Sequence, residues 1–241
     1  MALISQEMIS TIGRTYIKGQ EWMNENGIDH CESVDVALAA ETYRYFWKPK
    51  PVKTVLLLPR DSQTCSPDLG HKVKSAWLKL GEHTSPNAFV RTPYCLGYGE
   101  PEIVPTLDNI IAEKNSPIWH TLAELVQRNY SPSLDLVPRL EHKARILHEL
   151  HRLGIWITHP SLFGDHAERP LIQQWWNGPG QFLQTEAPDA LLIAFGRGLY
   201  DDLIACNVPV ADYLYHPQGL QSDEHHAHQR RIVERVLKFN H

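Results

Sequence analysis

The sequence has no long hydrophobic run. Its longest unbroken apolar stretch, residues 190–195, is far shorter than the roughly 20 residues of a membrane-spanning helix. The N-terminal residues 1–7 contain no basic segment ahead of an apolar stretch, so they do not read as a secretory signal. The sequence therefore predicts a cytoplasmic protein with no membrane partner.

Cysteine is scarce and widely spaced. The chain has 4 cysteines, Cys31, Cys65, Cys95 and Cys206, and no two of them form a C-x-x-C pair. In a reducing cytoplasm such cysteines are most simply free, buried thiols. An iron–sulfur cluster with four thiolate ligands is the alternative, although such clusters usually include a close pair of cysteines. We expect no metal site and no cofactor.

An excess of positive charge is also missing. The chain has 23 Lys and Arg against 28 Asp and Glu, a formal net charge of −5. Binding of a nucleic acid would therefore depend on local basic patches rather than on the overall charge. The composition, 42% hydrophobic and 21% charged, excludes disordered and fibrous proteins and fits a single globular domain.

Short apolar segments alternate with stretches in which apolar residues recur at helical spacing. Residues 60–87 form a polar stretch that is typical of a long functional loop. The predicted helices are 3–26, 32–46, 117–128, 140–153, 170–182, 199–206 and 222–239. The predicted strands are 52–58, 155–158, 190–195 and 208–214.

This alternation of strand, polar turn and helix repeats four times. It predicts the α/β class, with a mostly parallel central sheet flanked by helices. The whole chain, 1–241, is expected to form one domain, in which residues 1–48 are an N-terminal helical extension. Ligands of such folds bind at the carboxyl ends of the strands.

Polar side chains follow three of the predicted strands. Arg60-Asp61-Ser62-Gln63 follows the first strand, His159-Pro160-Ser161 the second, and His216-Pro217-Gln218-Gly219-Leu220 the fourth. Because parallel strands end at one edge of a sheet, we expect these segments to line one cleft.

In order and strand context, these segments resemble the motifs of the uracil-DNA glycosylase superfamily over roughly residues 50 to 240. Asp61 stands at the acidic position of a first motif, Gly-Gln-Asp-Pro-Tyr, that ends a buried strand. Residues 154–159 echo a Gly-Val-Leu-Leu-Leu-Asn strand. His216, Pro217 and Leu220 match a last motif, His-Pro-Ser-Pro-Leu-Ser. The resemblance implies a three-layer α/β/α sandwich.

The resemblance also implies a role for each matched residue. Breaking a glycosidic bond develops positive charge on the sugar and negative charge on the departing base. Asp61 would hold the attacking water and stabilise the sugar cation, and His216 would donate to the pyrimidine O2. Leu220, carried by the turn with Gln218 and Gly219, would enter the DNA stack as the nucleotide is flipped out. No lysine in these motifs could form a Schiff base, which indicates a monofunctional enzyme that leaves an abasic site.

Two departures from the family pattern concern the base. His159 replaces the asparagine that reads the Watson–Crick edge of uracil, and an imidazole lacks the paired donor and acceptor of an amide. Gln63, next to Ser62, replaces a tyrosine that blocks substituents on C5. These changes suggest that the substrate is a C5-modified pyrimidine, such as a hydroxymethylated or glucosylated cytosine of phage DNA, and that the role is phage defence. Phe89 and Tyr94 are candidates for stacking on the flipped base.

Phosphate contacts would come from local basic residues. The candidates are Lys72, Lys74 and Lys79 in the long loop and Arg230 and Arg231 on the last helix. Ser222 provides an N-cap for that helix, whose first amides could hold a phosphate. DNA is therefore the expected partner, and no obligate protein partner is expected.

Simpler interpretations of the same residues stay open. Asp61 could cap a turn, His216 could turn the chain, Leu220 could pack inward, and His159 could be a core histidine. Trp175 and Trp176 are typical of helix packing. His225, His226 and His228 fit a solvated helix start better than a metal site, and residues 196–198 fit a strand-to-helix turn. Functionally, the alternatives are a conventional uracil-DNA glycosylase and a catalytically inactive descendant that binds DNA or protein.

Overall fold

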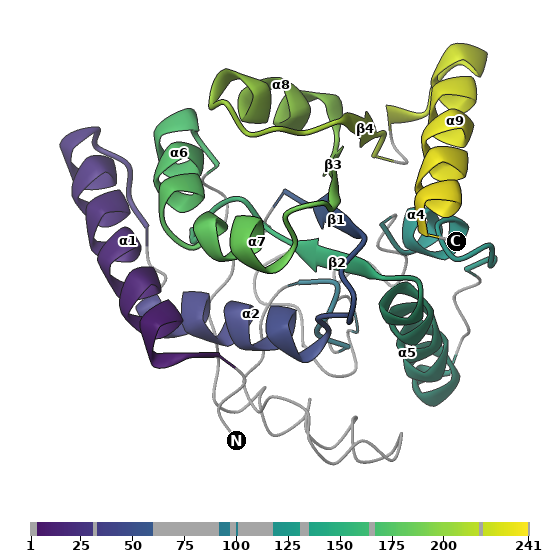
Figure 1. The fold of residues 1–241 in the computed structure, drawn as a ribbon, viewed down its shortest axis with the longest axis horizontal. Coiled ribbons are helices and arrows are strands. Elements are labelled where there is room, and N and C mark those ends of the chain that lie inside the picture. Colours follow the sequence, from purple (N-terminus) through teal and green to yellow (C-terminus); the bar gives the residue numbers. More distant parts are fainter. Residues whose placement is uncertain are drawn as a thin grey trace.

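The structure is a computed structural model that describes residues 4–30, 33–59, 92–96, 100, 118–130, 135–163, 167–216 and 219–240 (Figure 1). Helices and strands alternate along most of the chain after the first two helices. The helices are α1 (Gln6–Glu25), α2 (Val34–Phe46), α4 (Ile118–Glu124), α5 (Leu136–Arg152), α6 (Arg169–Asn177), α7 (Gly180–Glu186), α8 (Arg197–Ala205) and α9 (Asp223–Asn240). The strands are β1 (Thr54–Leu57), β2 (Ile155–Thr158), β3 (Leu191–Phe195) and β4 (Asp212–Leu214).

The four strands form one parallel sheet in the order β2-β1-β3-β4. β1 pairs with β2 on one side and with β3 on the other, so Thr54 faces both Ile155 and Leu191. Every residue of β1 and β2 is buried, which explains why these strands consist almost wholly of apolar residues rather than alternating with polar ones. The prediction of an α/β fold with a parallel sheet is confirmed.

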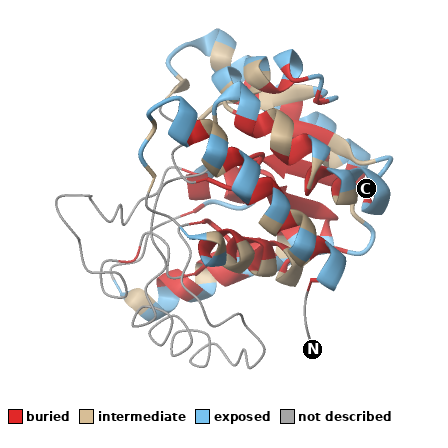
Figure 2. Cartoon of the chain, turned by 90° about the vertical axis from the view of Figure 1, so that its left-hand side faces the viewer, coloured by how far each residue is buried: buried red, intermediate tan, exposed pale blue. Residues whose placement is uncertain are grey.

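Alternate residues of the strands enter two separate hydrophobic clusters. Leu56, Ile157 and Ile193 belong to one cluster, which α4, α5 and α9 complete. Val55 and Trp156, which point the other way, belong to a second cluster completed by α1, α6, α7 and α8. In Figure 2 the buried residues lie on the sheet and on the sides of the helices that face it.

Two glycines make the connections at the ends of the strands possible. Gly154, between α5 and β2, has φ +80°, and a Cβ there would come 3.0 Å from the Pro51 carbonyl oxygen. Gly196, between β3 and α8, has φ +104°. Both conformations are ones that residues with side chains rarely adopt. The interpretation of residues 196–198 as a strand-to-helix turn is confirmed, because α8 begins at Arg197.

The predicted helix over residues 170–182 is two helices, α6 and α7. Gly178, which ends α6, lies so close to α1 that a Cβ would meet the Thr15 hydroxyl at 2.3 Å. Pro179 follows and lacks the N–H that would continue the helix. Trp175 and Trp176, at the end of α6, are buried in the second cluster, as helix packing predicts.

The fourth strand is shorter than predicted, because β4 covers only the last three residues of 208–214. Val208 and Val210 are buried in the second hydrophobic cluster, as strand residues would be. Of residues 208–211, however, only Ala211 bonds to β3, where its amide donates to the Leu192 carbonyl. The N-cap at the next helix is confirmed, since the Ser222 hydroxyl accepts from the His225 amide at 3.2 Å.

The first two helices supply buried side chains to the core. α1 packs against α6 and buries Met8 and Ile12, and its Gly19 lies directly against Phe163. α2 contacts the edge strand β2 and contributes residues to both clusters. Among the described residues, no helix has the length and apolar character needed to cross a membrane.

The packing of α1 predicts a difference between two of its isoleucines. Ile12 is 0% exposed and Ile17 is 56% exposed. We expect Ile12→Ala to lower the free energy of unfolding by about 2–5 kcal/mol, because it leaves a cavity in the second cluster. Ile17→Ala, the matched control, should change it by no more than about 0.5 kcal/mol. Urea denaturation of both variants measures this, and equal effects would mean that α1 is not part of the core.

Candidate functional site

The carboxyl ends of the four strands lie at one edge of the sheet, because all four are parallel. β1 lies between β2 and β3, so the chain continues to one side of β1 and later returns to the other side. Ligands of such folds bind at the point where the strand order reverses in this way. Among the described residues, His159 follows β2 and His216 follows β4 at this edge. β2 and β4 are the outer strands of the described sheet, so the two histidines lie at opposite ends of this edge, and the cleft that they are expected to line with Asp61 stays a prediction.

His159 connects the ends of two strands. Its ring is 4% exposed, and Nδ1 donates to the carbonyl oxygen of Leu58, directly after β1, at 3.1 Å. This contact places the proton on Nδ1. The ring of Tyr94 packs edge-on against the imidazole with centroids 5.6 Å apart. Tyr94 is itself 2% exposed, and its carbonyl accepts from Trp47 Nε1 at 3.0 Å.

His216 begins a closely bonded turn. Its half-buried ring meets the last residue of β3, Phe195, edge to face at 5.7 Å. The amide of Gly219 donates to the His216 carbonyl at 2.7 Å, and His225 Nδ1 donates to the Gly219 carbonyl at 2.8 Å. The His225 ring stacks on Tyr215 with centroids 4.5 Å apart. The described part of the turn is thus anchored to β4 and to the first turn of α9.

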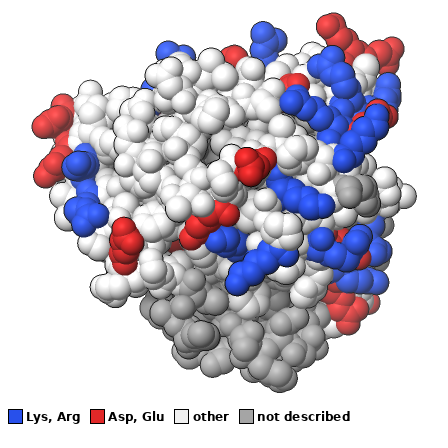
Figure 3. Space-filling model, viewed as in Figure 1, with Lys and Arg blue, Asp and Glu red and all other residues white. Residues whose placement is uncertain are grey.

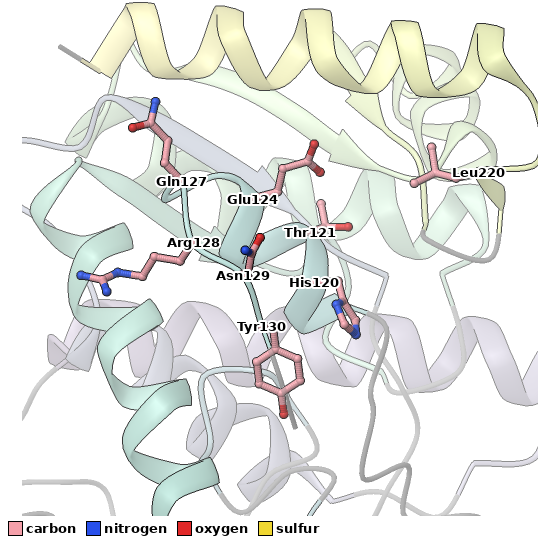
Figure 4. A pocket seen from close by; sticks show the side chains of 8 residues that line it. All are labelled: His120, Thr121, Glu124, Gln127, Arg128, Asn129, Tyr130 and Leu220. Atoms are coloured by element: carbon pink, nitrogen blue, oxygen red, sulfur yellow. The ribbon is translucent and has the colours of Figure 1, made fainter. Parts of the chain in front are cut away.

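A pocket of about 590 Å³ lies beside this turn and over α4 (Figure 4). Leu220, half-buried, forms one end of it. The sequence predicted a helix here but no site, although His120 and Glu124 stand at the i, i+4 spacing that puts two polar side chains on one helix face. The lining residues are His120, Thr121, Glu124, Gln127, Arg128, Asn129, Tyr130 and Leu220.

Three charged residues are buried together near the start of α5. Glu100, Arg139 and Lys143 are each at most 1% exposed. Arg139 Nη2 lies 2.7 Å from Glu100 Oε2, and Lys143 Nζ lies 2.5 Å from Glu100 Oε1. The ammonium also lies 5.3 Å from the centre of the Trp119 ring. Sequence reasoning did not find this cluster, because Glu100 is far from α5 along the chain.

Burial governs the ionisation of groups in this cluster. It lowers the pKa of Lys143 below its ordinary value, although the neighbouring Glu100 carboxylate opposes the shift. Burial, together with the charge of Glu100, raises the pKa of Tyr130 to about 12. Because α5 leads directly into β2 and packs along it, the cluster lies toward the carboxyl edge of the sheet.

Another buried cation lies at the end of β2. Arg44, on α2, is 1% exposed, pairs with Glu41 at 2.5 Å and donates to the Thr158 hydroxyl at 3.2 Å. Its guanidinium carbon lies 4.6 Å from the centre of the Trp156 ring. This network ties α2 to the strand that carries His159.

The two candidate phosphate contacts on α9 are exposed. Arg231 Nη2 donates to His228 Nδ1 at 3.0 Å, and Arg230 lies beside it on the same helix. Figure 3 shows basic side chains gathered over α9 and around α5. The exposed ones on α9 are Arg230, Arg231, Arg235 and Lys238.

Several predicted site residues lie outside the described part of the chain, so the structure does not place them. They are Asp61, Ser62, Gln63, Lys72, Lys74, Lys79, Phe89, Pro217 and Gln218.

The described cysteines and histidines do not form a metal site. No group of three or more His, Cys, Asp or Glu side chains in the described ranges could hold a metal ion. Cys95 and Cys206 are buried and lie outside any disulfide, whereas Cys31 and Cys65 fall in parts that the structure does not describe. Burial raises the pKa of Cys206, whose Sγ donates to the Arg169 carbonyl at 3.3 Å.

Comparison of the chain with protein-family models, with curated proteins and with solved structures finds no match.

The lowered pKa of Lys143 predicts a pH dependence of stability. Between that pKa and 10.5, the unfolded chain holds a proton that the folded protein has released, so the free energy of unfolding should rise with pH. We expect this rise, measured by urea denaturation between about pH 7 and pH 10, to be smaller in Lys143→Met. Exposed Lys18→Met is the control and should keep the wild-type slope; equal slopes in all three proteins would show that Lys143 keeps an ordinary pKa.

Proposed function

We propose that the protein is a monofunctional DNA glycosylase that flips out a modified pyrimidine and cleaves its N-glycosidic bond. The observation that carries the proposal is the parallel order β2-β1-β3-β4, which brings the ends of β1, β2 and β4 to one edge. These are the three strands that precede the segments resembling the uracil-DNA glycosylase motifs. Helices that complete clusters on both faces of the sheet fit the three-layer sandwich of that superfamily.

In this proposal, Asp61 follows β1 by four residues and supplies the carboxylate that holds the attacking water. His216 follows β4 at the same edge of the sheet, is held there by its turn, and donates to the O2 atom of the departing base. Leu220 enters the base stack when the nucleotide is flipped out. Arg230 and Arg231, exposed on α9, contact phosphates of the DNA.

His159 and Gln63 set the choice of base. The His159 ring is fixed by its bond to the Leu58 carbonyl and by Tyr94, so it presents one ring edge rather than the paired groups of an amide. Gln63 leaves room for a substituent on C5. Together they favour a hydroxymethylated or glucosylated cytosine over uracil, with Tyr94 supporting His159, and a role against phage DNA in the cytoplasm.

We expect Asp61→Asn to lower the rate of base release by about 100-fold or more while DNA binding is kept, because the carboxylate acts on the transition state. Oligonucleotides that contain uracil, 5-hydroxymethylcytosine or glucosylated 5-hydroxymethylcytosine are incubated with the full chain, and abasic sites are detected by alkaline cleavage. Binding is followed by fluorescence anisotropy.

The matched control is Asp189→Asn, an exposed aspartate just before β3 at the opposite edge of the sheet. It should release bases at the wild-type rate. If the wild-type protein releases no base from any of the three substrates yet binds DNA, the non-catalytic descendant replaces the enzyme.

The double variant Gln63→Tyr, His159→Asn restores both family residues. We expect its ratio of uracil release to modified-cytosine release to rise by about tenfold or more, because a single lost or gained base contact is worth about one power of ten. Gln181→Tyr, His151→Asn, at exposed positions on α7 and α5, is the control. Wild-type protein that already prefers uracil would mark a conventional uracil-DNA glycosylase instead.

A further inference from the structure

Apart from Leu220, the residues that line the pocket over α4 lie outside the motifs used above, and the carboxylate of Glu124 in this lining is held in a fixed orientation. The amide of Tyr215 donates to Gln229 Oε1 at 2.9 Å, and Gln229 Nε2 donates to Glu124 Oε2 at 3.2 Å. Gln229 is 2% exposed. Because its Oε1 accepts from the Tyr215 amide, its Nε2 is the atom that faces Glu124. The end of β4 thus orients a carboxylate on α4.

Within the described part of the chain, that carboxylate keeps unused acceptor capacity. A carboxylate offers about four lone-pair sites, and Gln229 occupies one of them. Glu124 is half-buried and lines the pocket, and Figure 4 shows its carboxylate on the side that faces Leu220. An oriented, partly desolvated acceptor pair is suited to a ligand with two neighbouring N–H donors.

The charges of the pocket favour a neutral ligand over an ion. Arg128 lines the same pocket, where it lies 3.3 Å from Glu149, so the lining carries a guanidinium as well as the Glu124 carboxylate. Gln127 and Asn129 add amides that both donate and accept. The Glu124 carboxylate would repel an anion, and the Arg128 guanidinium would repel a cation.

The walls of the pocket favour a flat ring. Tyr130, 5% exposed, forms one wall, and the His120 ring meets it edge to face at 5.3 Å. Leu220 supplies an apolar surface at the other end. A volume of about 590 Å³ has ample room for a nucleobase.

We propose that this pocket binds a guanine base, whose N1–H and N2–H groups donate to Glu124. Guanine alone among the common bases places two N–H donors side by side on its Watson–Crick edge. Cytosine and adenine place a ring-nitrogen lone pair next to their amino group, and uracil places its one N–H between two carbonyls, so each would set an acceptor against the carboxylate. The side chains of Arg128, Gln127 and Asn129 can donate hydrogen bonds to the guanine O6 and N7.

The proposal does not depend on base excision, so it is tested by binding alone. Isothermal titration calorimetry of the full chain with guanosine, inosine and adenosine separates the contacts. Inosine lacks only the N2 amino group, and adenosine lacks both donors. We expect guanosine to bind about tenfold more tightly than inosine, and adenosine to bind more weakly still.

The variant Glu124→Gln should remove the preference for guanosine over inosine, because an amide replaces one acceptor by a donor. Glu141→Gln, at an exposed position on α5 outside the pocket, is the matched control and should bind like the wild type. Thermal unfolding confirms that both variants are folded.

A second arm distinguishes the two sources of a guanine base. A short oligothymidylate with one central guanine is compared with the same strand carrying inosine, by fluorescence anisotropy. If the protein prefers the guanine strand and Glu124→Gln abolishes that preference, the pocket binds nucleic acid. If the protein prefers guanosine but shows no preference between the two strands, the pocket binds a free nucleoside or nucleotide. Absence of binding by all three nucleosides and both strands, or a guanine preference unchanged in Glu124→Gln, overturns the proposal.

Discussion

The pairing of β1 with a strand on each side is the constraint on which the rest of the structure depends. Its four residues supply hydrogen bonds to both β2 and β3, and its side chains enter both hydrophobic clusters. Its first residue also bonds to the last helix, because the Thr54 hydroxyl donates to the Asn240 side chain at the end of α9. A shift of β1 by one residue would exchange its two faces and misalign both neighbours.

Buried charges add a second constraint at the carboxyl edge. Glu100 gathers Arg139 and Lys143, and Arg44 joins α2 to the end of β2. Removing one partner from such a group leaves an uncompensated charge away from water, which is far costlier than any exposed ion pair. These groups therefore fix how α2, α5 and Glu100 fit around the strand ends.

The fold class could be predicted from sequence because apolar strands and amphipathic helices are local patterns. All four strands of the described sheet lie within the predicted strand segments, and the start of α9 was set by the cap at Ser222. The break between α6 and α7 could not be predicted in this way, since it reflects the close approach of α1 to Gly178. Val208 and Val210 were predicted as strand residues because burial in a hydrophobic cluster selects the same residue types as burial in a sheet.

The site shows the same division. The positions of His159 and His216 at one edge follow from the parallel direction of the strands, which the alternation of strands and helices predicts. Glu100 beside Lys143, and Gln229 beside Glu124, join segments that are distant in the chain, and no local pattern marks such pairs. The i, i+4 spacing of His120 and Glu124 was visible, but the pocket exists only once α9 and Leu220 lie next to α4.

The bonds around Gly219 have a consequence for the entropy of binding. His216, Gly219 and His225 are joined by hydrogen bonds, and the His225 ring rests on Tyr215. Leu220, directly after Gly219, therefore has its backbone ordered before any ligand arrives. A partner that contacts this leucine need not freeze a flexible loop, so more of the contact energy is available as affinity.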